Sequence, residues 1–301
     1  MAATVIEVSN LSRSFGRKRA LDTVSFRATE GRVYGLVGAN GAGKTTLIRH
    51  LLGLLRAKSG SVRVFGHDPV RNPVGVLGRV GYVSEERELP EWMRVHELMR
   101  YTEAYHVKWD AAYARELLET FALDPSKKIK DLSKGMRAQA ALVAAVAHRP
   151  ELLILDEPSS GLDTVVRRDI LDAIVRTVAD DGRTVVFSSH LLDEVERMSD
   201  HVTMINQGLV ALDGPLDDVR LAHRRTQVRF QDALAWPPAL DGALSVEGGG
   251  RSWQIVHNGS LETFRAAVAR IGGEIVQSRE ATLEEIYLAR VGRSSQDVEV
   301  G

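Results

Sequence analysis

A glycine-rich segment, GANGAGKTT at residues 38–46, constrains this chain more than any other feature. It matches the pattern GxxxxGK(S/T), in which glycines allow backbone N–H groups to turn inward and approach a polyphosphate closely. The apolar run RVYGLVG at 32–38 predicts a buried strand before it, and TTLIRHLLGLL at 45–55 has the periodicity of a helix after it. This context predicts a strand–loop–helix unit that binds a nucleotide, rather than an accidental glycine-rich turn.

In this loop each position has a chemical role. Lys44 supplies a point charge to the β- and γ-phosphates, and the Thr45 hydroxyl is a ligand for Mg²⁺. The helix that follows directs its positive end toward the anion. The loop residues predicted to bind the nucleotide are Gly38, Ala39, Asn40, Gly41, Ala42, Gly43, Lys44, Thr45 and Thr46.

Two acidic residues end a second apolar strand, LLILDEP at 152–158. In a parallel sheet the carboxyl end of such a strand lies beside the phosphate loop, where ligands bind. We expect Asp156 to hold Mg²⁺ directly or through water, and Glu157 to orient or deprotonate an attacking water. Alone, the two acids could simply cap a strand; with Lys44 upstream they predict a hydrolytic site.

The composition excludes several other classes of protein. The chain has 301 residues, of which 44% are hydrophobic, enough for one large domain and a smaller one. A net charge of −1 argues against a chain that coats nucleic acid or an anionic membrane. With no cysteine, disulfides and thiol chemistry are excluded. There is no secretion signal and no apolar run as long as a membrane span, so we expect a soluble, cytoplasmic protein.

Strands and helices alternate along most of the chain and predict a mostly parallel α/β sheet. That rhythm ends around 208–220, and beyond it we expect a small α+β accessory domain. The predicted parts are residues 1–216, a nucleotide-binding domain with a helical subdomain at about 87–149; residues 217–293, the accessory domain; and residues 294–301, a flexible tail.

Further motifs follow in a characteristic order. LSKGM at 132–136 stands before the helix that leads to LLILDEP, and SSGLD at 159–163 comes directly after it. GYVSE at 81–85 precedes the helical stretch, Phe15 ends the first strand, and His190 follows the strand VVFSS. Through these motifs the chain resembles the ATPase subunit of an ATP-binding cassette (ABC) transporter.

The resemblance implies a P-loop NTPase fold: a RecA-like core with a parallel sheet, an N-terminal antiparallel β subdomain and an inserted helical subdomain, followed by the small α+β domain. It implies that Phe15 stacks on adenine. It also implies that His190 contacts the γ-phosphate and holds the water that Glu157 activates. Taken singly, Phe15 could equally be a core residue and His190 a structural histidine.

A dimer is implied as well. Two cassettes of this family sandwich two ATP molecules head to tail. Ser133 and Gly135, at the place of the family signature LSGGQ, would then contact the γ-phosphate bound by the other chain, and Asp163 would carry information across the interface. We expect a homodimer, with a heterodimer as the alternative. A separate membrane permease would be a further partner, holding the protein at the inner face of the membrane, and we expect no nucleic acid.

Two positions depart from the family pattern. Glu85 stands where the family usually has glutamine; its carboxylate can still ligate Mg²⁺ or accept a hydrogen bond from its water, but cannot donate one. In the signature, Lys134 and Met136 replace glycine and glutamine, and Lys134 either adds charge near the nucleotide or is solvated. Because Glu157 and His190 are both present, we interpret the site as competent for ATP hydrolysis.

The sequence indicates only broadly which surface would bind the permease. In the family the helical stretch 87–130 binds the permease, and its large side chains either form that surface or fill the core: Trp92, Met93, Leu98, Tyr101 and Tyr105. The overall pattern resembles bacterial exporter ATPases for drugs, antibiotics or lipids. The alternatives are a soluble ABC ATPase outside transport and a nucleotide-dependent regulatory switch. A run of arginines beginning at Arg220 either meets an anionic partner or forms a solvated face.

Overall fold

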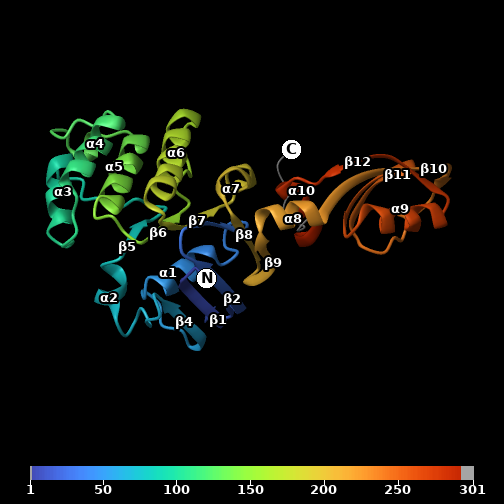
Figure 1. The fold of residues 1–301 in the computed structure, drawn as a ribbon, viewed down its shortest axis with the longest axis horizontal. Coiled ribbons are helices and arrows are strands. Elements are labelled where there is room, and N and C mark those ends of the chain that lie inside the picture. Colours follow the sequence, from blue (N-terminus) through green and yellow to red (C-terminus); the bar gives the residue numbers. More distant parts are fainter. Residues whose placement is uncertain (1, 293–301) are drawn as a thin grey trace. The chain divides into compact units, whose positions relative to one another are not determined.

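The computed structural model describes residues 2–292, apart from the side chains of 176–181. It divides the chain into two compact units, Met1–Leu212 and Asp213–Gly301, each shown as a ribbon in Figure 1. The division falls after residue 212, where the sequence predicted a boundary after 216. The predicted tail at 294–301 lies outside the described residues.

A six-stranded sheet forms the centre of the first unit, with strand order β5-β6-β7-β3-β8-β9. Its strands are β3 (Val33–Val37), β5 (Val80–Val83), β6 (Leu152–Asp156), β7 (Thr184–Ser189), β8 (His201–Asn206) and β9 (Leu209–Pro215). From β5 to β8 neighbouring strands pair in parallel. Every residue of β3, β6 and β7 is buried, because helices and a second sheet cover both faces. The predicted parallel α/β sheet is confirmed.

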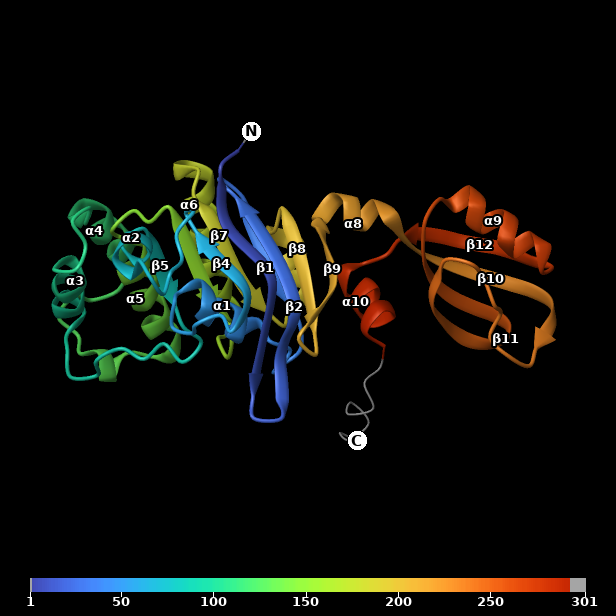
Figure 2. The same ribbon diagram turned by 90° about the horizontal axis from the view of Figure 1, so that it is seen from below.

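The second sheet of this unit is antiparallel, with order β2-β1-β4. It consists of β1 (Thr4–Phe15), β2 (Lys18–Thr29) and β4 (Ser59–Val64), and Figure 2 shows β1 and β2 as a long hairpin. Helix α1 (Lys44–Leu51) packs between the two sheets, since Leu47 and Ile48 share one core with Ile6 and Leu36. On the other side of the parallel sheet lie α6 (Thr164–Asp181) and α7 (Leu192–Met198) (Figure 1).

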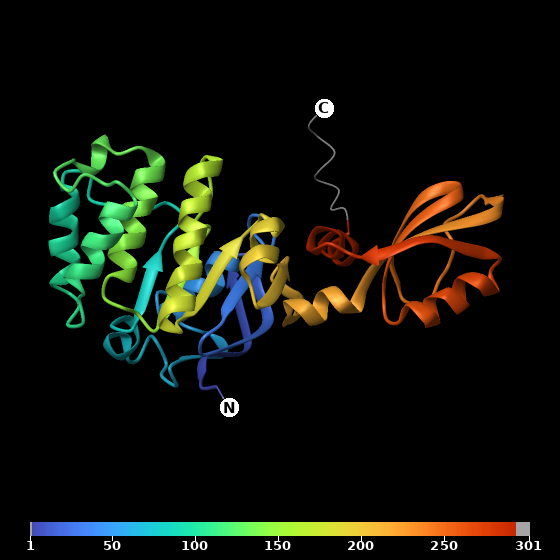
Figure 3. The same cartoon turned by 45° about the horizontal axis from the view of Figure 1, so that its top comes forward.

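Between β5 and β6 the chain forms the helical subdomain, with α3 (Val95–Glu103), α4 (Ala111–Thr120) and α5 (Lys134–Val146) side by side (Figure 3). Met93 and Leu98 belong to its buried core, whereas Trp92, Tyr101 and Tyr105 are 72%, 49% and 70% exposed. The apolar positions singled out in the sequence therefore divide between the two expected roles. The short helix α2 (Pro73–Leu77) and the strand β5 were not predicted.

The second unit begins within β9, and helix α8 (Leu216–Ala222) follows. The strand–helix rhythm, expected to end around 208–220, thus continues there through one more strand and one more helix. A three-stranded antiparallel sheet follows, in the order β11-β10-β12. Its elements are β10 (His223–Leu234), β11 (Ala243–Asn258), α9 (Leu261–Arg270), β12 (Gly273–Glu280) and α10 (Leu283–Val291).

Within this unit the arginines pair with acidic neighbours. Arg225 lies 2.5 Å from Glu285, and Arg220 lies 3.5 Å from Glu280. These contacts favour a solvated, internally paired face over an anion-binding one. In the part of the chain that is described, no helix has both the length and the apolar character needed to cross a membrane.

Candidate nucleotide site

The phosphate loop joins the end of β3 to the start of α1. A side chain at Gly38 would place its Cβ 2.3 Å from the carbonyl oxygen of Ile205, and one at Gly43 would lie 2.6 Å from that of Ala20. Gly43 also has a φ of 121°, which residues with a side chain rarely adopt. The loop is thus pressed against its neighbours at both ends, and only glycine fits there.

Three polar side chains, those of Lys44, Glu157 and His190, meet at the open end of this loop. Lys44 is 5% exposed; its ammonium donates to the carbonyl of Gly38 at 2.5 Å and lies 3.0 Å from Oε1 of Glu157. The other oxygen of that carboxylate lies 2.7 Å from Nδ1 of His190. The two catalytic candidates and the loop lysine, which come from α1 and the ends of β6 and β7, therefore form one continuous chain of contacts.

Glu157 has an unusual backbone. Its φ is 48°, in the left-handed region that non-glycine residues avoid at a cost of about 1–3 kcal/mol. Its N–H donates to the Ser188 hydroxyl at 2.9 Å, and that hydroxyl in turn donates to Asp156 at 2.7 Å. Such a conformation persists only where surrounding contacts hold it, and it directs the Glu157 carboxylate toward the phosphate loop.

Asp156 is buried beneath the loop, and the Thr45 hydroxyl hydrogen-bonds its carboxylate. Burial raises the pKa of Asp156, and the neighbouring Glu157 charge adds to this, while hydrogen bonds from Ser188 and Thr45 oppose it. A hydroxyl and a carboxylate side by side are the oxygen ligands that Mg²⁺ takes in phosphate sites. Among the described residues no group of three or more His, Cys, Asp or Glu side chains could hold a metal ion by itself. The donor set therefore fits an ion that phosphates and waters also coordinate.

A cavity of about 450 Å³ opens over the loop. It brings together parts of the chain that are far apart in sequence, and its lining is Phe15, Lys18, Ala20, Ala39, Asn40, Gly41, Gly43, Lys44, Thr45, Thr46, Glu85 and Glu157. Phe15 is 46% exposed, and the guanidinium of Arg13 lies 4.8 Å from the centre of its ring. Phe15 is therefore not a core residue, and its ring is available at the cavity. Lys18 was missed because it belongs to no motif.

Other predicted residues do not line this cavity. Ser133 is the exposed N-cap of α5, accepting the N–H of Met136 at 3.2 Å. Gly135 is buried, and a Cβ there would lie 2.8 Å from the side chain of Val166. Asp163 accepts the N–H groups of Val165 and Val166 at the start of α6. Within one chain these residues thus cap and pack two helices.

Lys134 of the signature is not simply solvated. Its ammonium lies against Gly161, where an added Cβ would be 2.1 Å away. The signature segment and the loop that follows Glu157 therefore touch within one chain.

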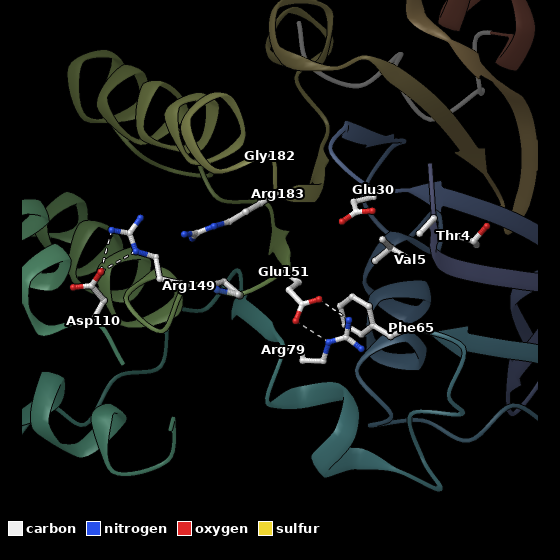
Figure 4. Close-up of a pocket in the computed structure, with 12 residues that line it drawn as sticks. Thr4, Val5, Glu30, Phe65, Arg79, Asp110, Arg149, Glu151, Gly182 and Arg183 are labelled. Carbon is white, nitrogen blue, oxygen red and sulfur yellow. Dashed lines mark hydrogen bonds and ion pairs between the residues drawn. The ribbon is translucent and has the colours of Figure 1, made fainter. Parts of the chain in front are cut away.

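A larger cavity of about 720 Å³ lies at the opposite, amino-terminal edge of the parallel sheet (Figure 4). Its arginines face acidic residues: Arg79 binds Glu151 through two hydrogen bonds of 2.9 and 2.5 Å, and Arg149 lies 3.0 Å from Asp110. These charges neutralise one another, and none of the predicted site residues lies there.

A phosphate loop at the carboxyl edge of a parallel sheet, facing two acids, defines a P-loop nucleotide-binding protein. Residues 21–160 match the family model described as ABC transporter. A daunorubicin resistance ATP-binding protein of Streptomyces coeruleorubidus is 36% identical over 97% of each chain. A bacitracin transport ATP-binding protein of Bacillus licheniformis is 31% identical over 74% of each chain. The chain belongs to the ABC transporter family.

Solved structures agree with this fold. An ATP-binding subunit of an ABC transporter matches with a TM-score of 0.67 and 31% identity, over 72% of this chain and 92% of that chain. A dimeric bacterial ABC transporter cassette matches with a TM-score of 0.64 at 20% identity, over 70% of this chain and 98% of that one. The chain is an ATP-binding, ATP-hydrolysing subunit of an ABC transporter, and the soluble ATPase and the regulatory switch are disfavoured.

Proposed function

We propose that the cavity over the phosphate loop binds Mg-ATP and hydrolyses it to move a solute out of the cell through a separate permease. The observation that carries the proposal is the chain of contacts from Lys44 through Glu157 to His190. Lys44 and Glu157 line the cavity and His190 contacts Glu157, so a cation for phosphate, a carboxylate for water and a polarising imidazole would all lie beside the bound nucleotide.

ATP would lie with its adenine on the exposed ring of Phe15 and its phosphates over the N–H groups that begin α1. Lys44 would exchange its contact with Glu157 for the β- and γ-phosphates. Thr45 and Asp156 would hold Mg²⁺, with Glu85 reaching it from the far wall of the cavity. When bound, the ion neutralises charge that develops on the phosphate oxygens.

Glu157 would then act as the general base. Released by Lys44, its carboxylate keeps the hydrogen bond to His190 and accepts a proton from the attacking water. The side chain of His190 is 40% exposed, and its second ring nitrogen, Nε2, would contact the γ-phosphate. The strained backbone of Glu157 and the Ser188 hydrogen bond fix where the base stands.

Two such chains would meet head to tail. Ser133 is exposed at the start of α5, where the helix N-terminus offers N–H groups and a partial positive charge to an anion. Ser133 and Gly135 would bind the γ-phosphate held by the second chain, and Asp163 would contact the same interface. The proposal favours two copies of this chain; a related cassette could take the second place.

The permease would bind the helical subdomain. A groove of about 650 Å³ lies between this subdomain and β5, and the exposed Tyr101 lines it. The ring of Tyr105 lies 5.2 Å from that of Tyr101, and Trp92 is exposed on the same subdomain. Aromatic side chains that are exposed together are typical of protein interfaces. The named drug-resistance and bacitracin-transport relatives support an exporter as the transporter that this subunit drives.

The test combines light scattering with ATP hydrolysis for the wild type and Glu157→Gln. We expect the wild type to hydrolyse Mg-ATP, and the variant to bind ATP, dimerise with it and lose at least about 100-fold in kcat. Glu151→Gln is the matched control, because Glu151 precedes the same strand at its opposite end and should leave kcat unchanged. Wild-type turnover in Glu157→Gln would contradict the proposal.

A further inference from the structure

Arg87 is a buried cation that the proposed reaction does not use. Only 7% of it is exposed, and its guanidinium forms no ion pair with any carboxylate among residues 2–292. Burial lowers its pKa, an effect that the charge of Glu85 opposes, but an arginine in a protein keeps its proton. A buried charge of this kind is costly unless dipoles surround it.

The dipoles come from one loop, residues 157–160, here named the Glu157 loop. Nη2 of Arg87 donates to the carbonyl oxygens of Glu157 at 3.3 Å, Pro158 at 2.8 Å and Ser160 at 3.1 Å. Arg87 is itself held in place, because its N–H donates to the carbonyl and hydroxyl oxygens of Ser84, each at 3.2 Å.

These contacts complete the support of the Glu157 backbone. On the amino side of Glu157, its N–H is held by Ser188; on the carboxyl side, its carbonyl and two that follow are held by Arg87. Because the φ of 48° is strained, the backbone would relax if one of the two supports were removed. Relaxation would displace a carboxylate whose place must be accurate to about 1 Å.

We propose that Arg87 is a positioning residue for ATP hydrolysis: by gathering three carbonyl oxygens of the Glu157 loop, it holds the general base where it can activate water. The proposal rests on the proposed function, since it requires Glu157 as that base. Arg87 also lines the groove between the helical subdomain and β5. One side chain therefore contacts both that groove and the loop that carries Glu157.

Kinetics of Arg87→Met and Arg87→Lys test the proposal. Methionine has a similar length but no donor, and lysine keeps the charge without the planar fork. We expect kcat to fall by about 10- to 100-fold in Arg87→Met and less in Arg87→Lys, while the Kd for ATP stays within about threefold. Arg79→Lys is the control, because it alters an arginine pair at the opposite edge of the sheet.

A double-mutant cycle separates positioning from a general structural role. In the Glu157→Gln background, Arg87→Met should change the residual kcat by less than about twofold, because the group that Arg87 positions is already lost. If Arg87→Met lowers kcat equally in both backgrounds, or leaves the wild-type kcat within about twofold, the inference is overturned. If Glu157→Gln alone keeps full turnover, the proposed function fails and the inference fails with it.

Hydrogen exchange gives a readout that does not depend on turnover. In Arg87→Lys, the peptide that spans the Glu157 loop should exchange faster than in the wild type, while the peptide over residues 38–46 should not change. If Arg87→Met does not fold, this measurement on Arg87→Lys decides the question. Unchanged exchange in the Glu157 loop would contradict the inference.

Discussion

Ser189 donates a buried hydrogen bond of 2.9 Å to Oε2 of Glu194. The same carboxylate oxygen accepts a second hydrogen bond, of 2.8 Å, from Ser159. Ser159 lies in the Glu157 loop, and Ser189 directly precedes His190. One buried carboxylate on α7 therefore holds together the two segments that carry the proposed base and its histidine.

We predict that Glu194→Gln is less stable and less active. A neutral amide oxygen accepts the two hydroxyls more weakly than a carboxylate oxygen does. The amide nitrogen would replace Oε1, which lies 3.6 Å from the Arg167 guanidinium, so the free energy of unfolding should fall by about 1–3 kcal/mol. Because His190 would lose its fixed position, kcat should fall by about 10-fold. Denaturant unfolding and ATP hydrolysis measure both effects. The exposed Asp193→Asn on the same helix should change neither, and equal behaviour of the two variants would contradict the prediction.

Gly43→Ala should abolish nucleotide binding. The methyl group would lie 2.6 Å from the carbonyl oxygen of Ala20, and the alanine would have to adopt a φ of 121°. The loop would therefore have to move. Gly66→Ala is the matched control. Gly66 has a φ of 77°, but an added Cβ would meet no atom within 4 Å, so this variant tests backbone strain without a steric clash. We expect ATP binding, measured by equilibrium titration, to disappear in Gly43→Ala and remain in Gly66→Ala. Binding in both would show that the close contact is unimportant.

Asp156→Asn should separate nucleotide binding from the metal requirement. The amide is a weaker ligand, so half-maximal hydrolysis should need at least about 10-fold more Mg²⁺, while ATP binding without metal persists. Since burial raises the pKa of Asp156, a proton competes with the metal, and Mg²⁺ affinity in the wild type should weaken as the pH falls. Asp172→Asn, an exposed residue on α6, is the control. An unchanged Mg²⁺ dependence in Asp156→Asn would exclude Asp156 as a ligand.

The second unit should lose stability in acid through Glu285. Burial alone would raise the pKa of this carboxyl, but hydrogen bonds from Arg279, the Thr282 N–H and Arg225 lower it to about 2, from an ordinary value of 4.5. The stabilisation is therefore complete above pH 4.5 and is lost as the pH falls toward 2.

Thermal unfolding from pH 6 to 2 tests this prediction. Glu285→Gln should show a lower Tm than the wild type at pH 6, and the difference should shrink as the pH falls toward 2. The neighbouring Glu284→Gln, which is exposed, should follow the wild type. A constant difference across the pH range would show that the charge of Glu285 does not stabilise the fold.

Local chemistry made much of the fold and the site predictable from the sequence. The phosphate loop and the acids after β6 combine fixed spacing with an apolar strand, and both signals lie within about ten residues. Within one chain Ser133 caps helix α5, and its proposed contact with the γ-phosphate requires a second chain. The division of Met93 and Tyr101 between core and surface also needed the packing, because both have the apolar spacing of a helix.

Arg87 shows why the remainder could not be predicted. Its partners are backbone carbonyls about 70 residues away, and backbone groups leave no pattern in a sequence. Lys18 is similar, since only the pairing of β1 with β2 brings it to the cavity. After residue 208 the strand–helix rhythm could not be followed in the sequence because glycines and a proline interrupt the periodicity, although Gly214 and Pro215 lie at the end of β9 and before α8.

Because Arg87 contacts the Glu157 loop and lines the groove, the two places are thermodynamically linked. Whatever occupies the groove and prefers one position of the guanidinium must change the free energy of the nucleotide-bound loop. By reciprocity, the nucleotide must change the affinity of the groove by the same factor. An occupant of the groove would therefore bind with one affinity before hydrolysis and another after it, and the free energy of ATP hydrolysis would drive that alternation in one direction.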